Sequence, residues 1–520
     1  MPSIDRDSIR SDIVQRWGIL DWKGRFPWWR KPAKVRILMY ADSSVHFEGG
    51  PFLGLQYVKT LLESRAYFYV DFDIATAHRD GTDPSASISG AMKLTDLDII
   101  NKYEQVWFFG INETPNLTPA EVTLLDQFMA APKFGGVLVT GDHANLGQGI
   151  AGQITRAGQM RRYPAPGLTP GKWNTTLEEG PDPGTSFDFE DQSDDRPQNV
   201  RYERFSIWSG QIFRRRYRPH PVMCGPTGPI TVFPDHQHEG EALAPVPGAG
   251  DPKWPTKGGY QERPRVIGWG KIKDPAAERH GQEIGLASAY DGQNVDVGRI
   301  VADSTWHHWF DINLTGIAAN PPYAGFDATP AGRAALTQID AYFLNCGVWL
   351  APPDQQVAMR HAAWWSILWT DRIVELSIDS PIWLLGEQAI NALGLRAPRC
   401  TVSEWIFDFP IFKEKIPRWE WPQLFEKFDL VSLPFEHFVA GGILRRLVRD
   451  VGPSSSERQF PREAPPDEVL FRAINAGIEE GLDALKEQLT QETVRVTELI
   501  RNDFRLSSSP NDRSPNIDKV

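Results

Sequence analysis

Gly135-Gly136-Val137-Leu138-Val139-Thr140-Gly141-Asp142-His143 is the stretch that decides the fold of this 520-residue chain. Its apolar, β-branched run is typical of a buried strand, and the flanking glycines permit a tight turn after it. Helix-like spacing follows over residues 148–162. A strand that turns directly into a helix is a unit of α/β proteins with a mainly parallel sheet, so we expect that fold class.

Short apolar runs alternate with helical periodicity on both sides of this stretch. They predict strands over 35–42, 67–74, 103–111, 230–233, 265–272, 284–290 and 299–304, and helices over 50–64, 117–131 and 331–350. Thr118 and Glu121 have the spacing of a capping box, and Pro119 occupies the first helical position. Residues 164–205 interrupt the pattern with Pro, Gly and acidic residues, and we expect an exposed insertion there.

The composition changes along the chain and predicts four parts. Residues 1–34 form a Trp-rich arm, 35–350 the α/β domain, 351–505 a mostly helical region and 506–520 a disordered tail. The last helix, expected over 467–501, has an apolar stripe suited to core packing, to docking or to pairing with a second copy of the chain. That stripe consists of Ile474, Ile478, Leu482, Leu485, Leu489, Val496 and Leu499.

Charge and cysteine content exclude several classes of protein. The formal net charge is -12, from 55 basic and 67 acidic residues, which disfavours nucleic-acid binding. Cys224, Cys346 and Cys400 are too few and too widely spaced for a disulfide framework or a Cys-based zinc site. The first 21 residues lack a secretory pattern, and no apolar run is long enough to span a membrane. We therefore expect a cytoplasmic protein without a membrane partner.

Histidines are the main functional signal. Six of the eleven fall in four clusters, most of them after predicted strands: His143, His220, His236 with His238, and His307 with His308. Ligands bind to open α/β sheets beyond the carboxyl ends of the strands, so these side chains can converge there. We predict His143, Asp42 and one of His307 and His308 as catalytic, with Ser43, Asn112, Asn145 and Ser304 contacting a small-molecule substrate.

A metal site is a further prediction. In an extended segment His236 and His238 project to one face, and Glu239 and Glu241 follow them closely. Two imidazoles and nearby carboxylates suit a divalent ion such as zinc, with a third ligand from this segment or from His143 or His307. Hydrogen-bonded loop histidines with solvated acidic residues are the alternative. No motif indicates a nucleotide cofactor.

Residues 34–350 resemble the class I glutamine-amidotransferase-like superfamily, most nearly its ThuA-like branch. The resemblance rests on Gly141-Asp142-His143, on His220-Pro221, on the stretch from Gly298 to Val301, and on His307 or His308. It implies a flavodoxin-like sheet with a strand-turn-helix elbow at Asp142 to Asn145. These amidotransferases carry a nucleophilic Cys at the elbow, whereas this chain has His143 there, which excludes Cys-dependent glutamine hydrolysis.

Three functions stay open on these grounds. The first is a hydrolase in which a His or a metal activates water, while backbone N–H groups at the elbow hold the developing negative charge. The second is a non-catalytic ligand-binding or assembly protein whose helical region makes the contacts. The third is a carbohydrate-active protein, which the family name and the Trp content suggest. The fold alone does not choose among them.

Overall fold

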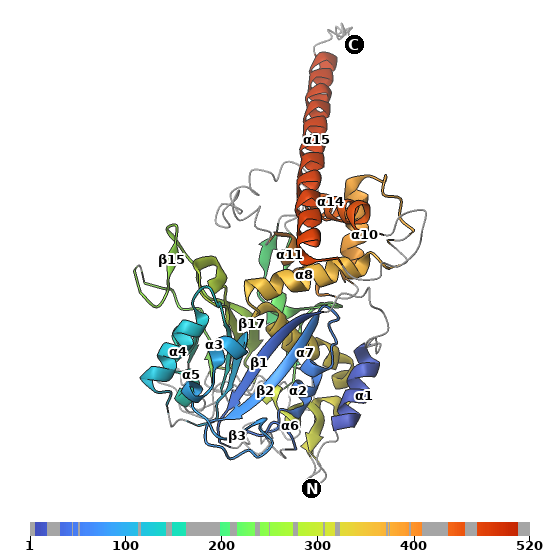
Figure 1. Ribbon diagram of the computed structural model, residues 1–520. Coiled ribbons are helices and arrows are strands. Elements are labelled where there is room, and N and C mark those ends of the chain that lie inside the picture. Colours follow the sequence, from blue (N-terminus) through green and yellow to red (C-terminus); the bar gives the residue numbers. More distant parts are fainter. Residues whose placement is uncertain are drawn as a thin grey trace, which may run out of the picture.

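The computed structural model in Figure 1 describes residues 6–17, 32–43, 45–49, 53–112, 116–141, 148–162, 198–207, 216–234, 240–248, 250–273, 279–304, 307–317, 323–370, 373, 375–394, 397–407, 435–452 and 465–507. It confirms the α/β class. A nine-stranded sheet forms the centre, in the order β3-β2-β1-β4-β5-β19-β18-β17-β8, and a helical region follows it in the chain.

The central sheet is mostly parallel. Every pairing from β3 across to β19 is parallel, whereas β18, β17 and β8 add to the far edge with antiparallel pairings. The strands are β1 (Ala33–Ala41), β2 (Val70–His78), β3 (Ile88–Ala91), β4 (Gln105–Phe109), β5 (Gly136–Thr140), β8 (Arg201–Tyr202), β17 (Arg265–Lys271), β18 (Glu283–Tyr290) and β19 (Ile300–Asp303).

Helices cover both faces of this sheet (Figure 1). One face packs against α1 (Arg6–Trp17), α2 (Gln56–Glu63), α6 (Asp311–Thr315) and α7 (Pro330–Trp349), and the other against α3 (Ile99–Lys102), α4 (Pro119–Met129) and α5 (Gln148–Ala151). Alternate residues of β1 serve the two faces: Ile37 and Met39 point to α7, and Leu38 and Tyr40 to α4. The predicted capping box is confirmed, because Thr118 and Glu121 exchange hydrogen bonds at the start of α4.

Several boundaries differ from the sequence-based expectations; the helix expected over 50–64, for example, begins at Gln56. Strand β2 continues to His78, four residues past the expected end at Ile74. The helix expected over 148–162 ends at Ala151, because Gly158 packs against the backbone of Gly152 so closely that a Cβ would lie 2.1 Å from the Gly152 oxygen. The piece expected over 230–233 is β13 (Val232–Phe233), which pairs with β7 (Gln198–Asn199) outside the central sheet.

Five further two-stranded sheets lie outside the central sheet. They are β6 (Arg161–Arg162) with β14 (Glu241–Ala242), β9 (Phe205–Ile207) with β10 (Arg216–Arg218), β11 (Cys224–Gly225) with β12 (Gly228–Pro229), β15 (Thr256–Lys257) with β16 (Tyr260–Gln261), and β20 (Gly316–Ile317) with β21 (Tyr323–Ala324). Most of the expected insertion, residues 163–197, lies outside the described ranges.

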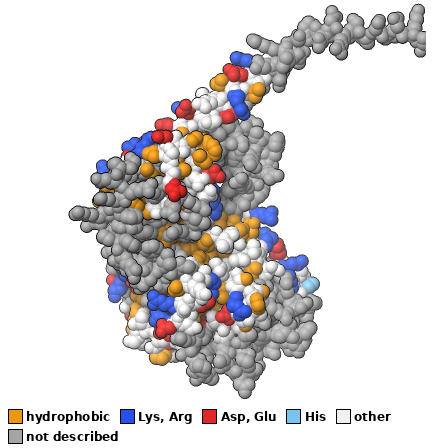
Figure 2. Space-filling view, turned by 90° about the vertical axis from the view of Figure 1, so that its right-hand side faces the viewer, with side chains coloured by type: hydrophobic (Ala, Val, Ile, Leu, Met, Phe, Trp, Pro, Cys, Tyr) orange, Lys and Arg blue, Asp and Glu red, His pale blue; other side chains and the backbone are white. Residues whose placement is uncertain are grey.

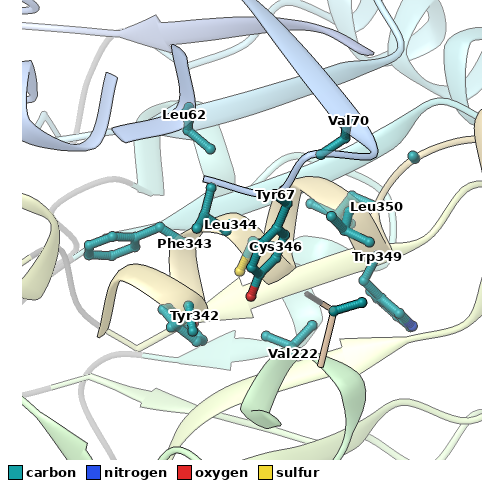
Figure 3. Close-up of a cluster of buried hydrophobic side chains, with 14 of the residues drawn as sticks. Leu62, Tyr67, Val70, Val222, Tyr342, Phe343, Leu344, Cys346, Trp349 and Leu350 are labelled. Carbon is teal, nitrogen blue, oxygen red and sulfur yellow. The ribbon is translucent and has the colours of Figure 1, made fainter. Parts of the chain in front are cut away.

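The helical region is built on the amino ends of the strands. It contains α8 (Pro353–Ile367), α10 (Ile382–Gly394), α11 (Arg399–Phe407), α14 (Phe435–Asp450) and α15 (Asp467–Ser507). A single apolar core runs from the sheet through α7 and α8 to α15. Figure 3 shows part of this core, where Tyr67 and Val70, just before and at the start of β2, meet Cys346 near the end of α7 and Leu350 directly after it. The two parts therefore share their packing.

The amino-terminal arm also docks on this core. Trp17 donates a hydrogen bond from Nε1 to Asp340 of α7 at 2.8 Å and lies edge-on against Tyr67. Trp22, Trp28 and Trp29 lie outside the described residues. None of the helices in the described ranges has an apolar stretch long enough to cross a membrane.

Candidate functional site

The order of the strands identifies the edge of the sheet where a ligand would bind. From β1 the chain goes to β2 and β3 on one side of β1, and it then crosses to β4 on the other side. In open α/β sheets, such a reversal opens a crevice beyond the carboxyl ends of the strands. We call this end of the sheet the carboxyl edge.

Asp42 occupies the centre of the carboxyl edge, directly after β1. Its side chain is fully buried, and its Oδ1 accepts hydrogen bonds from the backbone N–H groups of Ile111 at 2.7 Å and Asn112 at 3.2 Å. Burial raises the pKa of this carboxyl group to about 6, although those two N–H groups act to lower it. Asp42 can therefore take up or release a proton near neutral pH.

Ser43 continues from Asp42 in a strained conformation. Its φ is 53°, a left-handed value that is unusual for a residue with a side chain and is often found at functional sites. The Ser43 N–H donates to both carboxylate oxygens of Asp80, each at 3.1 Å. Thus Asp42, Ser43 and the Asn112 backbone, all predicted for the site, do meet at one place.

His78 ends β2 beside this group and was missed by the sequence analysis. Its ring is fully buried, and Nδ1 lies 2.6 Å from Oδ1 of Asp80, but neither ring nitrogen has a well-aligned hydrogen bond within the described structure. Burial lowers the pKa of His78, and the neighbouring carboxylates Asp80 and Asp83 act against that shift. The signal that could have found it was the same rule of strand ends, applied to the correct end of β2.

Strand β19 ends in a second buried polar group. The Asp303 carboxylate accepts hydrogen bonds from Tyr342 at 2.7 Å and from Trp309 Nε1 at 3.1 Å, and His308 Nε2 lies 2.8 Å from it. His308 also packs against the ring of Phe233 and is fully buried, while its Nδ1 has no hydrogen-bond partner in the described structure. His308 is thus the enclosed member of the His307–His308 pair, and the side chain of His307 lies outside the described residues.

Three segments that carry predicted site residues start or end at the buried guanidinium of Arg161. Its Nη2 donates to the Ser304 carbonyl oxygen at 3.3 Å. Gly141 and Gly240 lie so close that an added Cβ would be 2.8 Å from Arg161 Cζ and 3.1 Å from Nη2, respectively. The ends of β5 and β19 and the residue before β14 therefore meet at one positive charge.

The other predicted residues of those segments, His143, Asn145, His236, His238 and Glu239, lie outside the described residues. One premise of their prediction is wrong, because β13, the strand before His236, does not belong to the central sheet. Strand β13 pairs with β7 instead, and the paired residues Asn199 and Val232 are 33 positions apart in the chain. Local sequence does not specify such a contact.

Glu241, predicted as a metal ligand, is held by two arginines. Its Oε1 accepts from Arg162 Nε at 2.6 Å and its Oε2 from Arg279 Nη1 at 3.2 Å. A metal ion would have to compete with both guanidinium groups for this carboxylate. Among the residues that the structure describes, no group of three or more His, Cys, Asp or Glu side chains is arranged to hold a metal ion.

Unpaired polar side chains gather along the carboxyl edge. Ser304 Oγ and both amide atoms of Asn313 are fully buried and lack hydrogen-bond partners in the described structure. Asn313 belongs to this edge because its neighbour Asp311 accepts hydrogen bonds from the first N–H groups of α2. Buried polar groups are nearly always satisfied, so such a group calls for a bound molecule or a functional role.

Comparison with models of protein families, with curated proteins and with solved structures found no significant match to this chain.

Proposed function

We propose that the protein is a hydrolase that binds a small polar substrate at the carboxyl edge, between the ends of β1 and β19. One observation carries the proposal: the fully buried groups of Ser304 and Asn313, which have no hydrogen-bond partner within the described structure, lie along the edge that has Asp42 at its centre. Each unsatisfied group costs about 1–3 kcal/mol of folding free energy. A substrate that supplies hydrogen bonds to them would recover part of that cost.

The strand order supports the flavodoxin-like sheet that the ThuA-like resemblance implies. Leaving out the edge strand β3, the parallel strands β2-β1-β4-β5-β19 follow the order 2-1-3-4-5 of flavodoxin-like folds. The elbow at Asp142 to Asn145 would then follow β5, next to Arg161. Its backbone N–H groups and the Arg161 guanidinium would stabilise negative charge that develops on the substrate.

The proximity of Gly141 and Gly240 to Arg161 supports a shared site for the histidines predicted in the same two segments. His143 and His238 themselves lie outside the described residues. In this proposal His143 or His307 serves as the base for water, and Asp42 exchanges protons nearby.

A metal-assisted version of the same reaction requires His236 and His238 as ligands, joined by Glu239 or His143. A bound zinc ion would supply activated water. Glu241 fits this version less well than Glu239, because it would have to leave Arg162 and Arg279. Elemental analysis of untagged protein tests it: near-stoichiometric metal that falls sharply in the double variant His236→Ala with His238→Ala would support it.

Hydrolysis is tested by assaying full-length protein against chromogenic esters, amides, phosphoesters and glycosides. We expect turnover of one class, reduced at least 100-fold by His143→Ala and unchanged by His437→Ala in the remote helix α14. Turnover that survives His143→Ala at full rate would contradict the assigned base. Thermal stabilisation by a compound that is never hydrolysed would favour the non-catalytic ligand-binding function instead.

A further inference from the structure

Helix α15 has two parts with different surroundings. Its base, from Asp467 to Leu482, packs on α14, and the contact is so close that a Cβ at Gly442 would lie 2.1 Å from the Gly477 oxygen. The remainder, Asp483 to Ser507, leaves the body as a single helix (Figure 1). We call it the stalk; at 1.5 Å per residue its length is roughly 37 Å.

The apolar stripe of the base continues along the stalk. Positions 475, 478, 482, 485, 489, 492, 496 and 499 alternate in steps of three and four, and all but Asn475 and Glu492 are apolar. This is the 3.5-residue repeat of a left-handed coiled coil. Ile478 is buried against α14, whereas Leu485 and Leu489 are partly exposed and Leu499 is 55% exposed. The repeat therefore continues beyond the part of α15 that α14 covers.

The stalk also has the charge pattern of a helix that pairs with another helix. Residues 483–501 carry four acidic and three basic side chains, and both signs are visible along it in Figure 2. A mixed, nearly neutral helix on a chain of net charge -12 has no electrostatic attraction to anionic lipid or to nucleic acid. A lone helix of this length is marginally stable in water, so burial of the stripe is needed to hold it.

We propose that two copies of this chain pair through their stalks as an antiparallel coiled coil. A second copy fits because it brings a stripe of the same length and spacing, and a two-fold axis lets each stalk cover the other. In a symmetric parallel pair the two bases would lie side by side on the stripe. That position is already filled by α14, which contacts α15 up to Gly481. In the antiparallel arrangement, the tip of each stalk reaches toward the end of the partner's α14.

The first experiment measures the molar mass of full-length protein by light scattering. We expect a dimer, twice the 58.6 kDa of one chain, that becomes monomeric in the double variant Leu485→Asp with Leu489→Asp. The matched control is Thr490→Asp with Thr497→Asp, which adds the same charges on the exposed side of the stalk and should leave the dimer intact. Circular dichroism shows whether each variant remains folded.

Orientation needs a second measurement, with a spin label on Arg501→Cys near the tip. The native cysteines are all buried, so labelling should be selective. In an overlap of the two stripes from Leu482 to Leu499, Arg501 lies roughly 16 Å from the centre of the overlap. Two labels in an antiparallel pair should therefore lie about 30 Å apart. A short distance would overturn the antiparallel arrangement. A monomer at 100 µM, or a dimer that survives Leu485→Asp with Leu489→Asp, would overturn the proposal.

Discussion

The two ends of the central sheet differ in how fully some of their buried polar groups are hydrogen-bonded. At the amino edge, where the helical region docks, Gln105 donates to the Gly347 oxygen at 2.6 Å and accepts from Trp107 at 2.9 Å. Arg299 there binds Asp291 and Glu404, each at 2.9 Å, and the Trp349 oxygen. At the carboxyl edge, Ser304 and Asn313 are just as buried, but their side chains make no hydrogen bond to any residue that the structure describes.

This difference separates stability from function within one sheet. Satisfied buried networks contribute to folding, whereas unsatisfied groups reduce stability and persist where something else requires them. We therefore expect the hydrogen-bonded networks of Gln105 and Arg299 at the amino edge to stabilise the fold, and we propose the chemistry at the carboxyl edge. Substitutions at the two edges should have different, and in one case opposite, effects on the free energy of unfolding.

The largest effect is expected at the amino edge. Arg299→Leu leaves Asp291 and Glu404 without their shared cation, in a position where the Arg299 side chain is only 2% exposed. Breaking a buried ion pair from one side costs about 3–5 kcal/mol, so the free energy of unfolding in urea should fall by that amount. Arg201→Leu, at an ion pair with Glu283 that is nearly half exposed, should change it by less than about 1 kcal/mol. Equal losses of unfolding free energy in the two variants would show that the buried ion pairs of Arg299 contribute no more than an exposed one.

The next effect concerns pH at the carboxyl edge. Burial raises the pKa of Asp42 from 3.8 to about 6, so the folded state holds this proton more tightly than the unfolded state. Stability therefore falls as the pH rises from about 4 to about 6, by roughly 3 kcal/mol for this group alone. Asp42→Asn keeps an acceptor for the two N–H groups and should gain stability relative to wild type across that range. A difference curve that is flat from pH 4 to pH 7 would contradict the shift.

The pKa of Glu121 shifts in the opposite direction from that of Asp42. Although its burial acts to raise the pKa, hydrogen bonds from Arg79, Thr118 and Leu94 lower it to about 2. Its contribution is therefore present above the unfolded pKa near 4.5 and is lost as the pH falls toward 2. The difference curve for Glu121→Gln should accordingly run in the opposite direction from that of Asp42→Asn.

The smallest effects have opposite signs at the two edges. Gln105→Met leaves the Trp107 N–H and the Gly347 carbonyl without partners and should destabilise the protein by about 1–3 kcal/mol. Ser304→Ala removes a hydroxyl that has no partner among the described residues, and we expect it to stabilise the protein by up to about 1 kcal/mol. Chemical denaturation measures both. Destabilisation by Ser304→Ala would mean that its hydroxyl is satisfied in solution.

Most elements that were predicted correctly depend on local sequence. The capping box of Thr118 and Glu121 involves residues three positions apart, and α7 was expected within one residue of both its ends, Pro330 and Trp349. Contacts between distant segments were not readable. The pairing of β13 with β7, and the approach of Gly158 to Gly152 that ends α5 early, are set by tertiary packing.

The candidate site was predictable to the extent that strand ends were placed correctly. The end of β1 gave Asp42 and Ser43, whereas the expected end of β2 at Ile74 excluded His78. Arg161 could not be identified from sequence, because it was expected near the end of a helix and instead lies in the short strand β6. Its meeting with Gly141, Gly240 and Ser304 depends on three loops that are far apart in the chain.

Docking of the helical region on the amino edge also fixes where the stalk points. Because α15 grows from that region, the stalk and the carboxyl edge lie at opposite ends of the molecule (Figure 1). Joining two chains through their stalks would leave both carboxyl edges at the outer ends of an elongated particle, facing away from each other. Each would then be reachable by a bulky substrate, such as the end of a polymer, without obstruction from the second subunit.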